Sequence, residues 1–467
     1  MRLLLVSTYE LGHQPVHLAS AASALRAAGI EVAVVDLSVE ALSAGDLDSI
    51  DAIAFSVPMH TAMRLAARAA EEIRSGYPAM PMAFYGLYAV VGSGDSVRSL
   101  QASAFAGEYL DDLVGWALAI RGGAAPGNEA SVAMGHPRAL VPDRSGLPGH
   151  EEYARLEWQG RARLAAAVEA SHGCRHRCRH CPIPVLYDGR LRVVGAEPVL
   201  ADIAALASSG VEHVTFADPD FLNAPRYSID LLRQAHQAHP ELTFDVTVKV
   251  EHILNHRGLW DQMAELGVLF VISAFESVDE QTLVILDKGH TVADMGEAVE
   301  VTRSAGVQLR PTWLPFLPWT RPSDLADLAR FLDLHELWPA TDPVQLSIRL
   351  LIPEGSLLEA HPAVVPHLIG YDGPSLIWRW DFADPTTEVL QKQLDAIAAE
   401  GSDCGADSFG TLNEMRSAIA MASGSDLGAL APFNSSVPRL TESWFCCAEP
   451  TAGQTTAVTI GGIRVPG

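Results

Sequence analysis

The chain has 467 residues, which at about 150 residues per domain predicts about three domains. Hydrophobic residues make up 48% and charged residues 19%, so there is apolar material for more than one core and the disordered class is excluded. The 32 basic and 57 acidic residues give a net charge of −25, which argues against nucleic acid and an anionic membrane surface as partners. With no signal-peptide pattern and no apolar run of the ~18 residues that a membrane span needs, we expect a cytoplasmic protein with reduced thiols.

Residues 1–122 alternate short apolar runs with amphipathic segments, which predicts a doubly wound, Rossmann-like parallel sheet. The expected strands are residues 3–7, 31–36, 52–57, 82–85 and 104–106, and the clearest helices are 15–28 and 61–75. Such sheets bind ligands at the carboxyl ends of their strands. The loops at 8–14, 56–60 and 86–91 are therefore expected to face a ligand.

Residues 123–160 are rich in glycine, proline and alanine, which predicts a linker. The strand–helix rhythm then restarts, and six such units within residues 161–353 predict a partial (β/α)6 barrel. The expected strands are residues 164–171, 213–217, 242–248, 269–275, 307–314 and 344–350. Residues 354–467 are expected to form a mostly helical extension, with helices at 386–400 and 410–423.

Three of the six cysteines follow the first expected barrel strand, where Cys174, Cys178 and Cys181 form a C-x3-C-x2-C loop. Three thiolates on one short loop can hold three irons of a [4Fe–4S] cluster and leave the fourth iron open to a substrate. The alternative is structural zinc, with His172, His176 or His180 as the fourth ligand. The cluster is favoured because active sites form at this end of a barrel.

With this loop, residues 162–353 resemble the radical SAM superfamily. The resemblance implies that S-adenosylmethionine (SAM) binds the open iron, and that reduction of the cluster cleaves one of its carbon–sulfur bonds. It also implies a small-molecule substrate and an electron donor such as flavodoxin or ferredoxin. The sequence departs from the family at His180, because the residue before the third cysteine is usually aromatic and hydrophobic there.

Further SAM-binding positions are carried over from the same resemblance. Asp218 or Asp220, after the second barrel strand, stands where the family has a Gly-Gly-Glu-like element that meets the SAM amino group. Ser273 and Glu276, at the end of the fourth strand, fall where ribose contacts are made.

Two arginines stand on the last expected barrel strands. The resemblance implies that Arg310 and Arg349 meet the methionine carboxylate or an anionic substrate. The alternative for each is a packing contact or a surface ion pair.

The first 122 residues resemble the cobalamin-binding domain that often precedes radical SAM barrels. The resemblance lies in the five-strand rhythm, in residues 86–89 (Gly-Leu-Tyr-Ala) and in residues 107–109 (Gly-Glu-Tyr). The D-x-H-x-x-G motif, whose histidine ligates cobalt, is replaced by Thr-Tyr-Glu-Leu-Gly-His-Gln at residues 8–14. Two interpretations stay open: a domain that binds cobalamin, and a domain that serves only as a cap over the barrel.

Residues 443–450, Ser-Trp-Phe-Cys-Cys-Ala-Glu-Pro, place Cys446 beside Cys447. Adjacent cysteines rarely bond to each other, and two neighbouring thiols suit a soft, thiophilic centre. The string resembles the tail of the CUAEP/CCAEP-tail radical SAM proteins, in which selenocysteine aligns with Cys447. The architecture is also similar to ArsL-type enzymes, which transfer the 3-amino-3-carboxypropyl group of SAM to trivalent arsenic. The alternative is two free cysteines without a role, and Cys404 has no assignment.

The leading hypothesis is a radical SAM enzyme in which Cys446 and Cys447 hold a soft substrate, trivalent arsenic being one candidate. The first alternative is a cobalamin-dependent radical SAM methyltransferase. The second is a zinc-stabilised binding protein without turnover.

Overall fold

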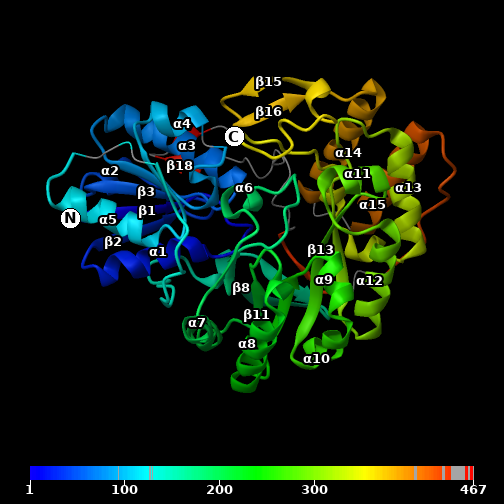
Figure 1. Cartoon of the computed structure of the whole chain (residues 1–467), viewed down its shortest axis with the longest axis horizontal. Coiled ribbons are helices and arrows are strands. Elements are labelled where there is room, and N and C mark those ends of the chain that lie inside the picture. The colour runs from blue at the N-terminus through cyan, green and yellow to red at the C-terminus, as the bar shows by residue number, and fades with distance from the viewer. Residues whose placement is uncertain are drawn as a thin grey trace.

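The chain opens with a six-stranded parallel sheet in the computed structural model (Figure 1). The strand order is β2-β1-β3-β4-β5-β6. These strands are β1 (Arg2–Ser7), β2 (Glu31–Asp36), β3 (Ala52–Ser56), β4 (Met82–Tyr85), β5 (Ser103–Gly107) and β6 (Ala130–Ala133). Helices α1 (Val16–Ala27) and α5 (Leu110–Arg121) pack on one face, and α3 (His60–Gly76) packs on the other. The predicted doubly wound domain is confirmed.

The structure describes residues 1–92, 94–125, 128, 130–403, 408–433 and 437–442, and the short strands at 458–460 and 463–465. Two strands lie in the segment that the sequence predicts as a linker: β6 and β7 (Arg155–Trp158). Strand β7 pairs with the next strand across a two-residue turn, Gln159 and Gly160, both with positive φ (52° and 72°). Two such residues form the turn that suits the twist of a β-hairpin.

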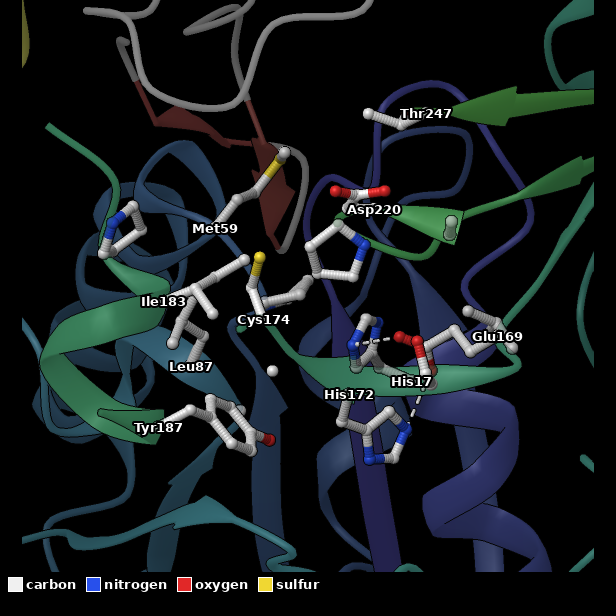
Figure 2. A pocket seen from close by; sticks show the side chains of 18 of the residues that line it. His17, Met59, Leu87, Glu169, His172, Cys174, Ile183, Tyr187, Asp220 and Thr247 are labelled. Carbon is white, nitrogen blue, oxygen red and sulfur yellow. Dashed lines mark ion pairs between the residues drawn. The ribbon is translucent and has the colours of Figure 1, made fainter. Parts of the chain in front are cut away.

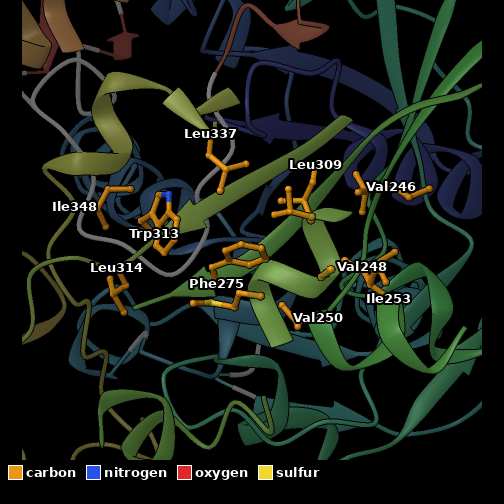
Figure 3. Packing of buried hydrophobic residues seen from close by; sticks show 14 of the residues in the cluster. Val246, Val248, Val250, Ile253, Phe275, Leu309, Trp313, Leu314, Leu337 and Ile348 are labelled. Atoms are coloured by element: carbon orange, nitrogen blue, oxygen red, sulfur yellow. The ribbon is translucent and has the colours of Figure 1, made fainter. Parts of the chain in front are cut away.

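A second sheet, in the order β14-β13-β12-β11-β8-β7-β17, forms a half-barrel. Its five parallel strands are β8 (Arg161–Val168), β11 (His213–Phe216), β12 (Thr243–Thr247), β13 (Val268–Glu276) and β14 (Gln308–Trp313). The helices that follow them are α7 (Ala196–Ser208), α8 (Pro225–Ala238), α9 (Val250–Asn255), α10 (Trp260–Glu265), α11 (Glu280–Leu286), α12 (Val292–Ser304) and α13 (Pro322–Leu334). Aromatic and aliphatic side chains fill the space between strands and helices (Figure 3). The Phe275 and Trp313 rings meet edge to face, with their centroids 5.5 Å apart.

The expected sixth barrel strand at 344–350 does not form. A 3₁₀ turn, η6 (Pro343–Leu346), takes its place, and a single parallel bridge joins Phe316 to Arg349. The Gln345 side chain accepts a hydrogen bond from the Trp313 backbone N–H at 2.9 Å. Among the described residues, backbone pairing beyond β14 is limited to this bridge, where Phe316 donates to Ile348 at 3.2 Å and accepts from Leu350 at 2.9 Å.

The C-terminal extension contains the two predicted helices, α14 (Pro385–Asp403) and α15 (Ser408–Ser423), next to a hairpin of β15 (Leu368–Asp372) and β16 (Ile377–Trp380). Strand β17 (Arg439–Leu440) pairs antiparallel with β7, and β18 (Val458–Ile460) pairs with β19 (Ile463–Val465). Within the part of the chain that the structure describes, every helix is too short or too polar to cross a membrane.

Candidate active site

A cavity of about 350 Å³ lies between the carboxyl ends of the N-terminal sheet and the mouth of the half-barrel (Figure 2). Both parts of the chain line it. The N-terminal side contributes Glu10, His17, Met59, Leu87 and Glu108, and the barrel side contributes Glu169, His172, Cys174, Asp220 and Glu276. The strand ends that the sequence predicts as ligand-facing therefore face one shared space.

The cysteine loop enters this cavity through a glycine that the fold requires. Strand β9 (Ser171–Gly173) follows β8 and pairs with β10 (Leu191–Val193). Gly173 has a φ of 74°, and a Cβ there would lie 2.3 Å from the Arg190 carbonyl oxygen and 2.7 Å from the Tyr187 ring. A residue without a side chain is needed where the chain turns from β9 into Cys174.

The three loop thiols, Cys174, Cys178 and Cys181, all line the cavity, and their surroundings fit a metal cluster. The Cys174 sulfur accepts hydrogen bonds from Asn223 Nδ2 at 3.4 Å and from the His176 backbone at 3.5 Å. Burial raises the pKa of the Cys174 thiol to about 12, so the protein itself leaves this sulfur protonated. Thiols of this kind ionise when a metal replaces the proton, and soft thiolates select iron–sulfur clusters or zinc.

The three histidines of the loop are each engaged by a carboxylate. His172 Nδ1 lies 3.0 Å from Glu108, His176 Nε2 lies 3.5 Å from Asp220, and His180 Nε2 lies 3.0 Å from Glu276. Each carboxylate contacts one ring nitrogen and leaves the other, so a histidine could serve as the fourth zinc ligand without losing its carboxylate. The three thiols together fit the predicted [4Fe–4S] site as well.

Glu276 is at the end of β13 as predicted, and it lies between two buried nitrogen groups. Its Oε1 accepts from Lys288 Nζ at 3.1 Å and lies 3.0 Å from His180 Nε2. Burial opposes ionisation, but Lys288 and His180 lower the pKa of Glu276 to about 2. Glu276 raises the pKa of Lys288 in turn. The carboxylate expected at the ribose thus holds an ion pair at the edge of the cavity.

A chain of five charged side chains crosses the cavity from the N-terminal sheet to the barrel. His17 lies 3.1 Å from both Glu10 and Glu169, and His172 lies 3.0 Å from Glu108 and 3.9 Å from Glu169 (Figure 2). We call these residues the interdomain ion-pair chain. Burial disfavours the protonated form of His17, but the neighbouring Glu169 and Glu10 carboxylates raise its pKa well above the usual value.

From the sequence, His172 is expected only as a possible zinc ligand and Glu108 only within a resemblance, and no ion pair is predicted among the members of the interdomain ion-pair chain. A signal was present, because Glu10, Glu108 and Glu169 all stand just after strands, at the edge where ligands bind. Their pairing with His17 and His172 depends on how the two domains meet, and no spacing in the sequence encodes that.

Replacing Glu169 by glutamine is expected to lower the free energy of unfolding by about 1.5–3 kcal/mol at neutral pH, since charged hydrogen bonds are lost. Because the pKa of His17 is raised, its contribution is complete below its unfolded pKa and is lost as the pH rises through the folded value. The variant should weaken this alkaline dependence and keep the part that Glu10 contributes, as measured by thermal unfolding across pH. Glu388→Gln, in an exposed pair with Lys392, is the matched control, and an unchanged pH profile in Glu169→Gln would contradict the expectation.

Asp218 and Asp220 take different positions. Asp218 accepts hydrogen bonds from the Ser171 hydroxyl and the Ala170 backbone, so it holds the start of the cysteine loop. Asp220 lines the cavity. Ser273 is fully buried on β13, outside the cavity lining. Of the two aspartates offered for the SAM amino group, Asp220 is the one that faces the cavity.

Arg310 and Arg349 lie outside the cavity lining. The Arg310 guanidinium pairs with Asp342 at 2.8 Å. The Arg349 guanidinium stacks over the Trp380 ring at 4.2 Å and donates to the Trp380 carbonyl. The structure brings neither arginine to the cysteine loop. Cys404, Cys446 and Cys447 lie outside the described residues.

A half-barrel whose first strand delivers three thiols to a shared cavity defines a class of enzymes with a metal cluster at the barrel mouth. Residues 168–331 match the family model described as the Radical SAM superfamily. The chain therefore carries a radical SAM domain, and this family implies a [4Fe–4S] cluster and SAM as cofactors. The chain spans less than a third of the length of the hopanoid C-2 methylase that it matches.

Known proteins resemble the chain over different parts of its length. The hopanoid C-2 methylase of Rhodopseudomonas palustris is 23% identical over 151 residues, which are 31% of this chain and 29% of that protein. The cobalamin-dependent SAM radical enzyme OxsB, solved with aqua-cobalamin and SAM, has a TM-score of 0.65 at 15% identity, covering 86% of this chain and 67% of its own. The methyltransferase TsrM from Kitasatospora setae has a TM-score of 0.55 at 18% identity, covering 72% and 71%. The structural likeness confirms the predicted fold, with a cobalamin-binding-like domain before the barrel.

Proposed function

We propose that this radical SAM enzyme transfers a carbon group of SAM to a small molecule bound in the cavity between the two sheets. The observation that carries the proposal is the shared cavity, because it opens the cysteine loop to the carboxyl ends of the N-terminal strands. Cys174, Cys178 and Cys181 would hold the cluster, which supplies the electron that cleaves SAM. A one-electron donor such as flavodoxin or ferredoxin and a cytoplasmic location belong to the same proposal.

The residues around the cysteine loop prepare the cavity for this reaction. Met59, Leu87 and Ile183 line it with apolar surface, which excludes water from a reactive carbon centre (Figure 2). Asp220 presents a buried carboxylate, and the Lys288–Glu276 pair fixes the charge beside Cys178. The chain thus offers an apolar chamber with charges at fixed positions.

We propose methyl transfer with cobalamin as the favoured form of the reaction. OxsB and TsrM were each solved with a cobalamin bound, and the hopanoid protein is a methylase. His17 belongs to the interdomain ion-pair chain, and residues 8–14 lack the D-x-H-x-x-G motif whose histidine ligates cobalt. We therefore propose binding without a histidine beneath the cobalt.

A second candidate is transfer to a soft acceptor held by Cys446 and Cys447, and the described residues on either side of this pair support it. Before it, Glu442 accepts a hydrogen bond from the Tyr9 hydroxyl at 2.5 Å. After it, β18 lies against α3, which begins next to the cavity residue Met59. Both flanks thus contact the N-terminal domain. Trivalent arsenic as this acceptor stays a prediction.

The products of SAM distinguish these forms. We expect purified, anaerobic, reduced enzyme to release S-adenosylhomocysteine and 5′-deoxyadenosine when cobalamin is bound, as methyl transfer requires. Methylthioadenosine, formed when arsenite is supplied and lost in the Cys446→Ser, Cys447→Ser double variant, would favour the soft acceptor instead. Enzyme with a full cluster that forms none of these products would contradict the proposed transfer.

A further inference from the structure

We propose that His176, Asp220 and His252 form a second metal site, which binds one divalent transition-metal ion beside the cysteine loop. The three side chains come from separate elements: the cysteine loop, the loop after β11, and helix α9. Their ligand atoms, two ring nitrogens and one carboxylate oxygen, all lie within 4.8 Å of one another. Such a site ties the cysteine loop to two neighbouring elements of the barrel.

The strongest observation is the contact between these atoms. Asp220 Oδ2 lies 2.7 Å from His252 Nδ1 and 3.5 Å from His176 Nε2, yet all three atoms are buried and none makes a hydrogen bond of acceptable geometry. The other oxygen of Asp220 accepts the Leu222 N–H, so Oδ2 is the one left for a further partner. The two ring nitrogens lie close to the oxygen but are not oriented to donate a hydrogen bond to it. Ligands of a common cation are arranged in this way.

The distances and the chemistry suit a transition metal. Ligand atoms bound at about 2.0–2.1 Å to a tetrahedral zinc are separated by about 3.3 Å. The two contacts of Asp220 Oδ2, 2.7 Å and 3.5 Å, lie on either side of that value, and all three ligand atoms lie within 4.8 Å of one another. Imidazole nitrogens prefer zinc, iron and nickel over magnesium or calcium. Asp220 is 1% exposed and supplies one negative charge where a dication would lie.

Metal binding would change the proton position on His176. Lys249 Nζ donates to His176 Nδ1 at 3.1 Å, which places the ring proton on Nε2 in the structure. With a metal on Nε2 the proton would move to Nδ1, the Lys249 ammonium would turn to Glu251, 3.4 Å away, and Glu251 Oε2, now 3.7 Å from Nδ1, would become its acceptor. His176 and Asp220 also line the cavity, so an open position on the metal faces its interior.

Zinc is the probe for this site, because it is distinguishable from the iron of the cluster. The cluster-loaded full chain, with Cys446→Ser and Cys447→Ser to remove the tail thiols, is incubated with Zn²⁺ without SAM, desalted and analysed for zinc, iron and sulfide. We expect about one zinc per chain beyond the cluster iron. His252→Ala and His252→Gln should lose this zinc, while His256→Ala, on the histidine whose ring contacts His252, should keep it.

Iron and sulfide content and the thermal midpoint show that each variant is folded and loaded, so the readout does not depend on turnover. Zinc retained by both folded His252 variants would overturn the site. A parent protein that binds no zinc would also overturn the site. Loss of SAM binding in Asp220→Asn would then show that this carboxylate serves the SAM amino group. Loss of methyl or other carbon transfer leaves the zinc count unaffected, so this test stands apart from the proposed function.

Discussion

Replacing Cys178 by serine is expected to abolish the cluster and to reduce SAM cleavage to background. Cys178 is buried, with the charges of Lys288 and Lys249 opposing the effect of burial on its pKa. A serine oxygen is a hard donor and cannot substitute for a soft thiolate at iron. The measurements are iron and acid-labile sulfide per chain, and 5′-deoxyadenosine or methylthioadenosine after anaerobic reduction with SAM.

Asn223→Ala provides a graded comparison for this expectation. Asn223 donates to the Cys174 sulfur but is not itself a ligand. Loss of such an outer partner lowers metal affinity or activity by about 10–100-fold, so the variant should retain a measurable cluster. Wild-type protein with about one zinc and no sulfide would refute the cluster and support the zinc-stabilised binding protein.

Replacing Lys288 by methionine is expected to lower the free energy of unfolding by about 3–5 kcal/mol, because it leaves the buried Glu276 carboxylate without its ammonium partner. In the wild type the pKa of Glu276 is about 2, so its contribution is present above its unfolded pKa and is lost as the pH falls through the folded value. The deficit of the variant should therefore shrink in acid, where Glu276 becomes protonated. Chemical denaturation at several pH values measures this difference.

Two further variants separate the charge effect from packing. Lys288→Met combined with Glu276→Leu removes both charges and should recover most of the lost stability, since apolar replacement of a whole buried pair is often neutral. Lys392→Met breaks an exposed pair with Glu388 and should have no measurable effect. A Lys288→Met protein as stable as wild type at neutral pH would show that the pair contributes nothing.

Local patterns in the sequence were sufficient for the cysteine loop and for most strands. The spacing of Cys174, Cys178 and Cys181 encodes a ligand set within eight residues, and the apolar runs encode strands buried on both faces. The sixth barrel strand failed because an apolar run cannot show that the Gln345 side chain will meet the backbone of Trp313 instead. The spacing of apolar residues indicates which residues are buried. It does not indicate which group hydrogen-bonds to the backbone N–H and C=O groups at the edge of a sheet.

Contacts between distant segments were beyond the sequence. Glu276 was expected at the ribose, but its pairing with Lys288 depends on how the chain after α11 folds back. The alternatives stated for Arg310 and Arg349 were a packing contact or a surface ion pair. Arg349 makes a packing contact with a tryptophan ring, whereas Arg310 is buried where it pairs with Asp342 rather than at the surface. A charged residue at a strand end thus indicates a site, while its partner is known only from the packing of the domains.

The antiparallel pairing of β17 with β7 fixes the position of the backbone shortly before the tail cysteines in the sequence. Backbone pairing fixes Arg439 opposite Glu157 and Leu440 opposite Leu156, so the chain leaves the sheet at a defined point beside the Tyr9 loop. Cys446 follows Glu442 by four residues, which at most reach about 14 Å. In the soft-acceptor candidate, an acceptor bound to these thiols would stay within that reach of Glu442, at an effective concentration of about millimolar or more. Binding to such a carrier would let the enzyme work on a scarce acceptor without waiting for it to diffuse to the cavity.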